Sequence, residues 1–286
     1  KGVYDSTNQK VVIVYRDNGN SYYGTAVVGT ASGSSISFGS AVVFESANTS
    51  WISIAYDVNA EKVVISYRDQ GNSTFDSTNQ KVVIAYCDAG NSYHGTAIVG
   101  TVSGTSISFG SAAVFENSET SSSISATFDS NAQKVVIAYR NDGNSAYGTA
   151  AVGTVSGTSI SFGTPVVFES ANTFNVAIAY DAGSQKVVVA YKDNGNSNYG
   201  TAIVGTVSGT SISFGTALVF ESDNISQTSA TYDANAQRVV IAYEDVNNSG
   251  YGTAVVFQTG SISTNITSEN YIGMSSGTAF QTGSAA

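Results

Sequence analysis

The chain has 286 residues, a formal net charge of −10 and a share of charged residues of only 11%. Ser and Thr together make up 72 residues, so hydroxyl and amide groups must cover much of the surface. The acidic balance argues against nucleic-acid binding, which needs a basic face. No apolar run reaches the ~18 residues of a membrane-spanning helix, so we expect no membrane span.

A phrase of the form (Tyr/Phe)-Asp-x-x-x-(Gln/Glu)-(Lys/Arg)-Val-Val recurs along the chain, at spacings of 52, 19, 53, 52 and 52 residues. Two further phrases, Gly-(Thr/Ser)-Ser-Ile-Ser-Phe-Gly and Gly-Asn-Ser, recur with it. Self-similarity at a fixed period of this length is the signature of a repeat architecture. The copies of the first phrase begin at Tyr4, Tyr56, Phe75, Phe128, Tyr180 and Tyr232.

Taken in chain order, each full repeat predicts four strands that are rich in β-branched and aromatic residues. Strand a ends in Tyr-Asp or Phe-Asp, and strand b is Lys-Val-Val-Ile-Ala-Tyr or a close variant. Strand c begins with Tyr-Gly-Thr-Ala, and strand d begins with Ser-Ile-Ser-Phe-Gly. Examples are strand a at Val176–Tyr180, strand b at Lys134–Tyr139, strand c at Tyr199–Val207 and strand d at Ser211–Phe220.

The connection between strands b and c reads Asp-Asn-Gly-Asn-Ser, as at Asp193–Ser197. Asn-Gly predicts a hairpin turn in which both residues accept positive φ, so we expect the turn glycines, Gly195 among them, to adopt positive φ or to permit a tight turn. Asn247 replaces this glycine in the last copy and fits the same expectation, because Asn tolerates positive φ better than most residues do. The Ser-Gly-Thr sequence predicts a tight turn between strands c and d.

Strand b is apolar at consecutive positions, and Val187, Val188 and Val189 must therefore point to opposite faces of the sheet. Both faces are buried when small sheets stack face against face. The sequence thus predicts an all-β protein, a β-propeller-like ring of ~52-residue four-stranded blades. A β-solenoid is the alternative, although its coils are shorter.

One repeat is truncated, so the predicted ring has five or six blades over residues 1–259. The unit at Tyr56 is only 19 residues long: it keeps strands a and b and then reaches Gly71-Asn72-Ser73, which we interpret as a turn into Phe75. Without strands c and d, strand b near Val63–Tyr67 is expected to present an open edge, which is a liability unless something covers it.

Few residues predict chemistry. His94 is the only histidine and stands where other copies have Tyr, and Cys87 stands where other copies have Arg; neither has the partners that catalysis or metal binding needs. Asp17, Asn18 and Asn20 resemble the start of a calcium loop, but no bidentate carboxylate follows, so we favour a hairpin turn. We predict no catalytic residue, no metal site, no cofactor and no enzyme activity.

Exposed aromatic residues beside Asn and Ser suit stacking on sugar rings, although packing between blades explains the same pattern. The candidate glycan-binding residues start strand c: Tyr23, Tyr147, Tyr199 and Tyr251. Five sequons, about as many as composition alone would produce, are candidate N-glycosylation sites, and two of them, at Asn72 and Asn247, fall in predicted turns. The sequon asparagines are Asn48, Asn72, Asn224, Asn247 and Asn265.

The segment Lys186–Gly215 resembles a repeat common in aquatic metagenomic sequences, which include tail-fibre-like and virion-associated proteins of aquatic phages and large bacterial surface proteins. The segment Ile266–Gly273 is similar to the sequence that follows such repeats. The resemblance covers essentially the whole chain, departs from the pattern at the short Tyr56 unit and transfers no functional residue. It implies an extracellular, cell-surface or virion fibre component without catalysis.

The tail at 260–286 leaves the repeat pattern but keeps strand-like segments at Ser261–Ser263, Asn270–Ile272 and Thr278–Phe280. We expect it to add a strand to the open edge of another copy, which gives a head-to-tail homopolymer. The alternatives are closure of its own ring, or disorder. The predicted function is a non-enzymatic structural protomer of an extracellular fibre, and the alternative is a carbohydrate-binding adhesin of a phage tail fibre or cell surface.

Overall fold

A computed structural model of the chain describes residues 2–5, 10–32, 35–48, 53–57, 62–66, 71–76, 81–103, 106–259, 272–273 and 281–282. Over these ranges the protein is all-β, as predicted. The helical segments among them are two single 3-10 turns, η1 (Ala89–Asn91) and η2 (Asp142–Asn144). The chain divides into two compact units, residues 1–117 with 154–161 and residues 118–153 with 162–286.

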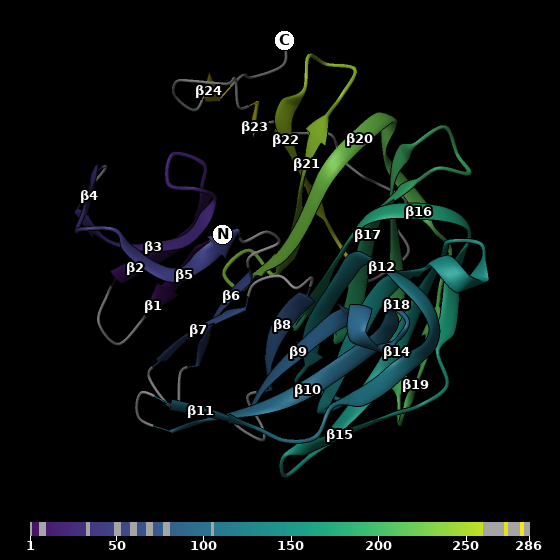
Figure 1. Cartoon of the computed structure of the whole chain (residues 1–286). Coiled ribbons are helices and arrows are strands. Elements are labelled where there is room, and N and C mark those ends of the chain that lie inside the picture. The colour runs from purple at the N-terminus through teal and green to yellow at the C-terminus, as the bar shows by residue number, and fades with distance from the viewer. Residues whose placement is uncertain are drawn as a thin grey trace. The chain divides into compact units, whose positions relative to one another are not determined.

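The first unit contains small antiparallel sheets (Figure 1). One has the order β1-β2-β3, with β4 and β5 both pairing with β3, and a second pairs β6 with β7. β8, β9 and β10 lie side by side at one end of a 15-stranded sheet, in which β11 also pairs with β10. The strands are β1 (Gly2–Asp5), β2 (Lys10–Asp17), β3 (Tyr23–Ser32), β4 (Ser35–Phe38), β5 (Val42–Asn48), β6 (Ser53–Asp57), β7 (Lys62–Ser66), β8 (Gly71–Asp76), β9 (Lys81–Asp88), β10 (His94–Ser103) and β11 (Ser106–Phe109).

The strands that follow repeat one antiparallel pattern up to residue 257. They are β12 (Ala113–Asp129), β13 (Lys134–Asn141), β14 (Tyr147–Ser156), β15 (Ser159–Phe162), β16 (Val166–Asp181), β17 (Lys186–Asp193), β18 (Tyr199–Ser208), β19 (Ser211–Phe214), β20 (Leu218–Asp233), β21 (Arg238–Asp245) and β22 (Tyr251–Phe257). Strands a, b and c of the predicted repeats are found in these elements, for example with strand b as β17 and strand c as β18.

The predicted strand d is not one strand: Ser211–Phe214 form β19, which pairs with β18, whereas Leu218–Phe220 begin β20. This second part of strand d and strand a of the next repeat form a single long strand. In β20, Leu218 pairs with Ala202 of β18, whereas Thr231 farther along pairs with Val240 of β21. β16 behaves in the same way, and Figure 1 shows both as long, bent strands. Each therefore belongs to two consecutive sheets, a continuity that the repeated phrases did not predict.

The interior sheets of the second unit bury both faces, as the consecutive valines predicted. Val187, Val189 and Tyr191 of β17 are fully buried in one apolar cluster, which includes Val136 of β13. The alternate residues of the same strand, such as Val188, lie in another cluster with residues of β21. β17 thus packs toward one neighbouring sheet with its odd positions and toward the other with its even positions.

One set of contacts recurs between successive repeats. The Phe168 ring in β16 lies 5.2 Å from the Tyr191 ring of the next repeat, and the Tyr191 hydroxyl donates to Glu169 Oε2 at 3.0 Å. The following pair of repeats has the same contacts: the Phe220 and Tyr243 rings are 5.2 Å apart, and Tyr243 donates to a carboxylate oxygen of Glu221 at 2.9 Å. The Val-Phe-Glu sequence of strand d therefore joins each of these repeats to its successor.

The expectation of positive φ at the b–c glycines is wrong. Gly195 has no positive φ; Ser197 and Asn198 adopt the left-handed conformation instead, at φ 55° and 67°. The loop between the paired residues Asp193 and Tyr199 has five residues rather than two, so the chain reverses its direction after the Asn-Gly pair. Glycine is required at 195 by close approach, because an added Cβ would lie 2.4 Å from the Cβ of Ala171.

The same correction applies to Asn247, which lies in a turn but has no positive φ; Ser249 and Gly250 adopt φ of 59° and 69°. The predicted c–d turn is confirmed where the structure describes it. Ser208 pairs with Ser211 across a two-residue turn, and Gly209, the first turn residue, has φ of 60°. This is the position at which a type II′ hairpin requires glycine.

The predicted turn at Gly71-Asn72-Ser73 is also wrong, because these residues begin β8 and pair with Tyr86, Ala85 and Ile84 of β9. Strand a of the third repeat therefore extends back through the Gly-Asn-Ser phrase, since ladder pairing with β9 overrides the turn preference. In the part of the chain that the structure describes, β7 has β6 as its hydrogen-bonded neighbour, and Tyr67 of the expected open edge lies outside that part.

Most of the tail lies outside the described residues, including Ser261–Ser263, Thr278–Phe280 and most of Asn270–Ile272. Its described residues form a short ladder in which β23 (Ile272–Gly273) pairs antiparallel with β24 (Gln281–Thr282).

Candidate functional site

The candidate glycan-binding tyrosines occupy equivalent places, each as the first residue of a strand that follows a b–c loop. Tyr23, Tyr147, Tyr199 and Tyr251 begin β3, β14, β18 and β22. Tyr251 is exposed, whereas the other three are half-buried. In the second unit, Tyr147, Tyr199 and Tyr251 begin the c strands of successive repeats, so one aromatic position recurs from repeat to repeat.

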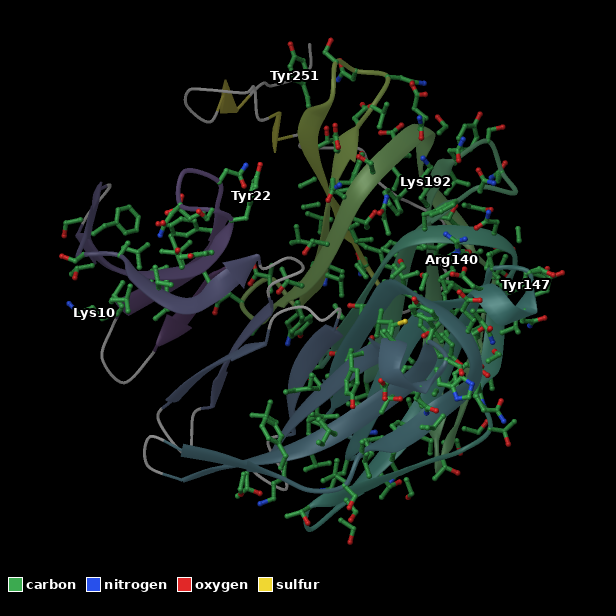
Figure 2. All side chains as sticks on the ribbon, viewed as in Figure 1. Lys10, Tyr22, Arg140, Tyr147, Lys192 and Tyr251 are labelled. Atoms are coloured by element: carbon green, nitrogen blue, oxygen red, sulfur yellow. The ribbon has the colours of Figure 1, made fainter. Side chains whose placement is uncertain are left out.

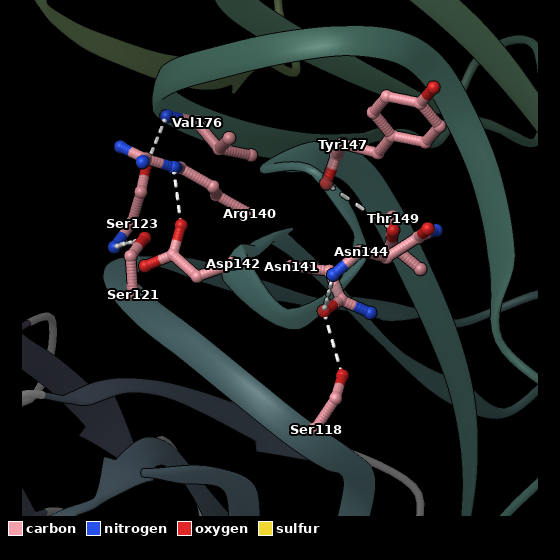
Figure 3. Close-up of polar contacts among 10 residues, drawn as sticks. All are labelled: Ser118, Ser121, Ser123, Arg140, Asn141, Asp142, Asn144, Tyr147, Thr149 and Val176. Atoms are coloured by element: carbon pink, nitrogen blue, oxygen red, sulfur yellow. Dashed lines mark hydrogen bonds and ion pairs between the residues drawn. The ribbon is translucent and has the colours of Figure 1, made fainter.

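Figure 3 shows how polar side chains build one of these loops. Asn141 Oδ1 accepts hydrogen bonds from the Asn144 backbone N–H at 3.1 Å and from the Ser118 hydroxyl at 2.7 Å. The Asn141 side chain thereby caps the 3-10 turn η2. The ring of Tyr147 points away from this group, and its backbone carbonyl accepts a hydrogen bond from Thr149 at 3.4 Å.

A basic residue at the end of strand b stabilises the same loop. Arg140 Nε lies 2.6 Å from Asp142 Oδ1, and the Arg140 guanidinium lies 4.3 Å from the centre of the Phe174 ring. An ion pair and a cation–π contact thus join the loop to the next long strand. The repeat-phased arginine at this position has a local structural role.

The oxygen atoms that resembled a calcium loop are used to form the turn. Asp193 Oδ1 accepts from the backbone N–H groups of Gly195 and Asn196 at 2.9 and 3.1 Å. Asp17 and Asp88 each accept in the same way from the glycine two residues later, at 3.0 Å. Within the described ranges there is no group of three or more His, Cys, Asp or Glu side chains that could hold a metal ion.

Two exposed aromatic residues were missed by the sequence reasoning. Tyr22 and Tyr93 are the last residues of their b–c loops and have φ of 65° and 59°. Left-handed backbone is uncommon for a bulky side chain, and such strain often marks functional positions. Figure 2 shows Tyr22 extending from its loop. The available signal was the doubled aromatic in Tyr22-Tyr23 and Tyr93-His94, where the other copies have a single Tyr.

His94 and Cys87 have structural surroundings. His94 is the first residue of β10, is half-buried and pairs with Asp88 in the ladder with β9. Cys87 is buried, and its thiol donates to the backbone carbonyl of Tyr93 at 3.6 Å.

The sequon asparagines differ in their positions. Asn247 lies in an exposed turn, as expected, and its side-chain amide donates to Asp223 Oδ1. Asn224 lies within β20 with its side-chain oxygen buried, Asn72 lies in β8, and Asn48 ends β5. Asn265 lies outside the described residues. Of the sequon asparagines in the described residues, Asn247 is therefore the one that lies in an exposed turn.

A scan of the chain against protein-family models finds no match, and a search of curated proteins finds no match either. Among the described residues, no helix has both the length and the apolar character that crossing a bilayer demands.

Proposed function

We propose that the chain is a non-enzymatic structural protomer of an extracellular fibre, on a cell surface or a virion, that assembles head to tail with other copies. The observation that carries this proposal is the repeated contact between successive sheets of the second unit, in which apolar residues fill both faces of β17. Repeat arrays of this kind are extended by adding another sheet, so their ends are suited to self-association.

The fold that accompanies this proposal is of the propeller type, with five or six blades of which one is truncated; a β-solenoid remains the alternative. Its support is the apolar packing of both faces of β17 between successive repeats, with the end of strand d running on into strand a of the next repeat. Two end sheets that pack together within one chain would give a closed ring. End sheets that pair between chains would give a filament.

The tail supplies the first proposed route to assembly, in which a strand from 260–286 adds to the edge of β7 in another copy. Electron microscopy of the full-length protein and of a variant lacking 260–286 tests this route. A folded monomer after truncation supports strand donation between copies. Unchanged fibres contradict it, and an unfolded product means that the tail completes its own chain.

A carbohydrate-binding adhesin is the second candidate, favoured by the exposed side chains of Tyr22, Tyr93 and Tyr251 beside Asn and Ser residues. Binding to a glycan array is the direct test. We expect any signal to fall at least tenfold in a variant that combines Tyr199→Ala with Tyr251→Ala. Tyr22→Ala and Tyr93→Ala test the loop aromatics separately, and a full-length protein that binds no glycan contradicts the adhesin function.

A further inference from the structure

Within the second unit, the sheet of the last repeat, formed by β21, β22 and the end of β20, has one buried and one exposed face. On β21, Val239, Ile241 and Tyr243 are buried against the preceding sheet. The residues of the opposite face are at least partly open to solvent, and Val256 of β22 is 51% exposed. We call this opposite face the trailing face: Val240, Ala242, Ala254 and Val256.

The trailing face has the composition of an interior contact. One repeat earlier, the equivalent residues Val188, Ala190 and Ala202 are fully buried. They lie in the cluster that also contains Val239, Ile241 and Tyr243 of the next sheet. The apolar surface formed by Val188, Ala190 and Ala202 is therefore covered. The surface formed by the same residue types at the equivalent positions of the next repeat is open to solvent.

The first sheet of the chain shows the opposite asymmetry. On β2, Val12 and Val14 are buried, whereas the alternate residues are more open and Tyr15 is 37% exposed. In the interior strand β17 the equivalents of these alternate residues are fully buried. We call this surface the leading face: Val11, Ile13 and Tyr15.

The two open faces are complementary, because both apolar clusters described between successive repeats of the second unit pair trailing-face positions of one sheet with leading-face positions of the next. We propose that the trailing face of one copy docks on the leading face of a second copy. A second copy fits this surface for two reasons. The docking would repeat the contact between successive sheets, and none of the seven residues of the two faces is charged. The contact is heterologous, so it propagates copy by copy.

This inference rests on the proposed self-assembly but assigns it to a surface other than the tail. The test uses the full chain and three variants. Val256→Asp places a charge in the trailing face, and Tyr15→Asp places one in the leading face. Val219→Asp is the matched control, because Val219 is 39% exposed on β20 and belongs to neither face.

Electron microscopy and sedimentation velocity provide the readout, with circular dichroism as a check of folding. We expect the full chain and Val219→Asp to form filaments, and Val256→Asp and Tyr15→Asp to remain folded monomers. Because each face variant keeps one intact face, it should also act as a chain terminator and shorten filaments when mixed at one part in ten with the parent protein.

Other outcomes overturn the inference in distinguishable ways. Filaments that form equally well with Val256→Asp and Tyr15→Asp refute face docking and leave the proposed fibre function standing. A full chain that stays monomeric refutes both face docking and the proposed fibre function. In that case, a lowered Tm of Val256→Asp identifies ring closure within one chain. Filaments that survive loss of 260–286 but not Val256→Asp support the faces over the tail.

Discussion

Where the structure describes the loop between strands a and b, the aspartate that ends strand a is a turn former rather than a marker of chemistry. Asp181 Oδ1 accepts from the backbone N–H groups of Gly183 and Ser184 at 2.9 and 3.2 Å. The turn then closes through Gln185, which has φ of 56°. The recurring (Tyr/Phe)-Asp-x-x-x-(Gln/Glu)-(Lys/Arg) phrase is thus the sequence of an Asp-capped hairpin loop.

Asp193 has the same role in the b–c loop, and its loss should destabilise the fold. Asp193→Ala removes the acceptor for two backbone N–H groups, so we expect the free energy of unfolding to fall by about 1–2 kcal/mol. Asp193→Asn keeps an acceptor oxygen at the same place and is the control. Urea unfolding of both variants provides the measurement, and equal stability of Asp193→Ala and the parent would contradict the capping role.

Tyr191 should make stability depend on alkaline pH. Burial and the neighbouring Glu169 carboxylate raise the pKa of its phenol above the ordinary 10.0. Because the folded pKa exceeds the unfolded one, the stabilisation is complete below about pH 10 and is lost as the pH rises beyond that value. Tyr191→Phe should cost about 1–3 kcal/mol at neutral pH through loss of the hydrogen bond to Glu169.

Urea unfolding between pH 7 and pH 11 tests this prediction. We expect the parent to lose stability more steeply above pH 10 than Tyr191→Phe does. Tyr147→Phe, whose ring points away from the loop contacts in Figure 3, is the control and should follow the parent curve. Parallel curves for the parent and Tyr191→Phe would show that the Tyr191 phenol does not contribute.

At the scale of whole elements, two of the glycines that end a Ser-Ile-Ser-Phe-Gly phrase, Gly110 and Gly163, allow successive repeats to approach closely. A Cβ added to Gly163 would lie 2.0 Å from the backbone carbonyl oxygen of Thr210, in the c–d turn of the next repeat. Gly110 has the same relation to Thr158, with 1.8 Å. At Gly215, the nearest atom is the Val204 carbonyl oxygen at 3.8 Å.

Gly163→Ala and Gly215→Ala therefore form a matched pair. The first inserts a methyl group against rigid backbone, so we expect a loss of about 1–3 kcal/mol in stability. The second adds a methyl group at an ordinary van der Waals distance from the Val204 carbonyl oxygen and should change stability by less than about 0.5 kcal/mol. Thermal unfolding compares the two, and equal Tm values would show that contact at Gly163 does not limit the approach of the repeats.

For the molecule as a whole, the contacts between sheets are mainly apolar and should resist salt. Raising NaCl to about 1 M shortens the screening length to ~3 Å, which weakens exposed charge pairs but not buried apolar contacts. We expect the β circular-dichroism signal and any filaments to persist. Loss of either in salt alone would indicate that charges hold the repeats together.

The candidate surface could be predicted only in part. The repeated position of Tyr23, Tyr147, Tyr199 and Tyr251 at the loop ends followed directly from the phrase that contains them. Their burial did not, because it depends on the neighbouring sheet, and of these four only Tyr251 is exposed. Tyr22 and Tyr93 were missed because their exposure also depends on the surrounding structure: the equivalent Ala146 has the same left-handed backbone and is buried.

The sequence by itself determined the period, the all-β class, the order of strands a, b and c along a repeat and the burial of both faces of strand b in the interior repeats. These properties are local, since they follow from side-chain alternation and turn-forming residues spaced a few positions apart. Only the tertiary structure decided that the end of strand d continues into strand a in β16 and β20, and that Gly71–Ser73 pair in β8. It also decided that the positive φ falls at Ser197 and not at Gly195. Each of these depends on which distant strand supplies hydrogen bonds and on how closely neighbouring chain segments approach, and neither is encoded in any single repeat.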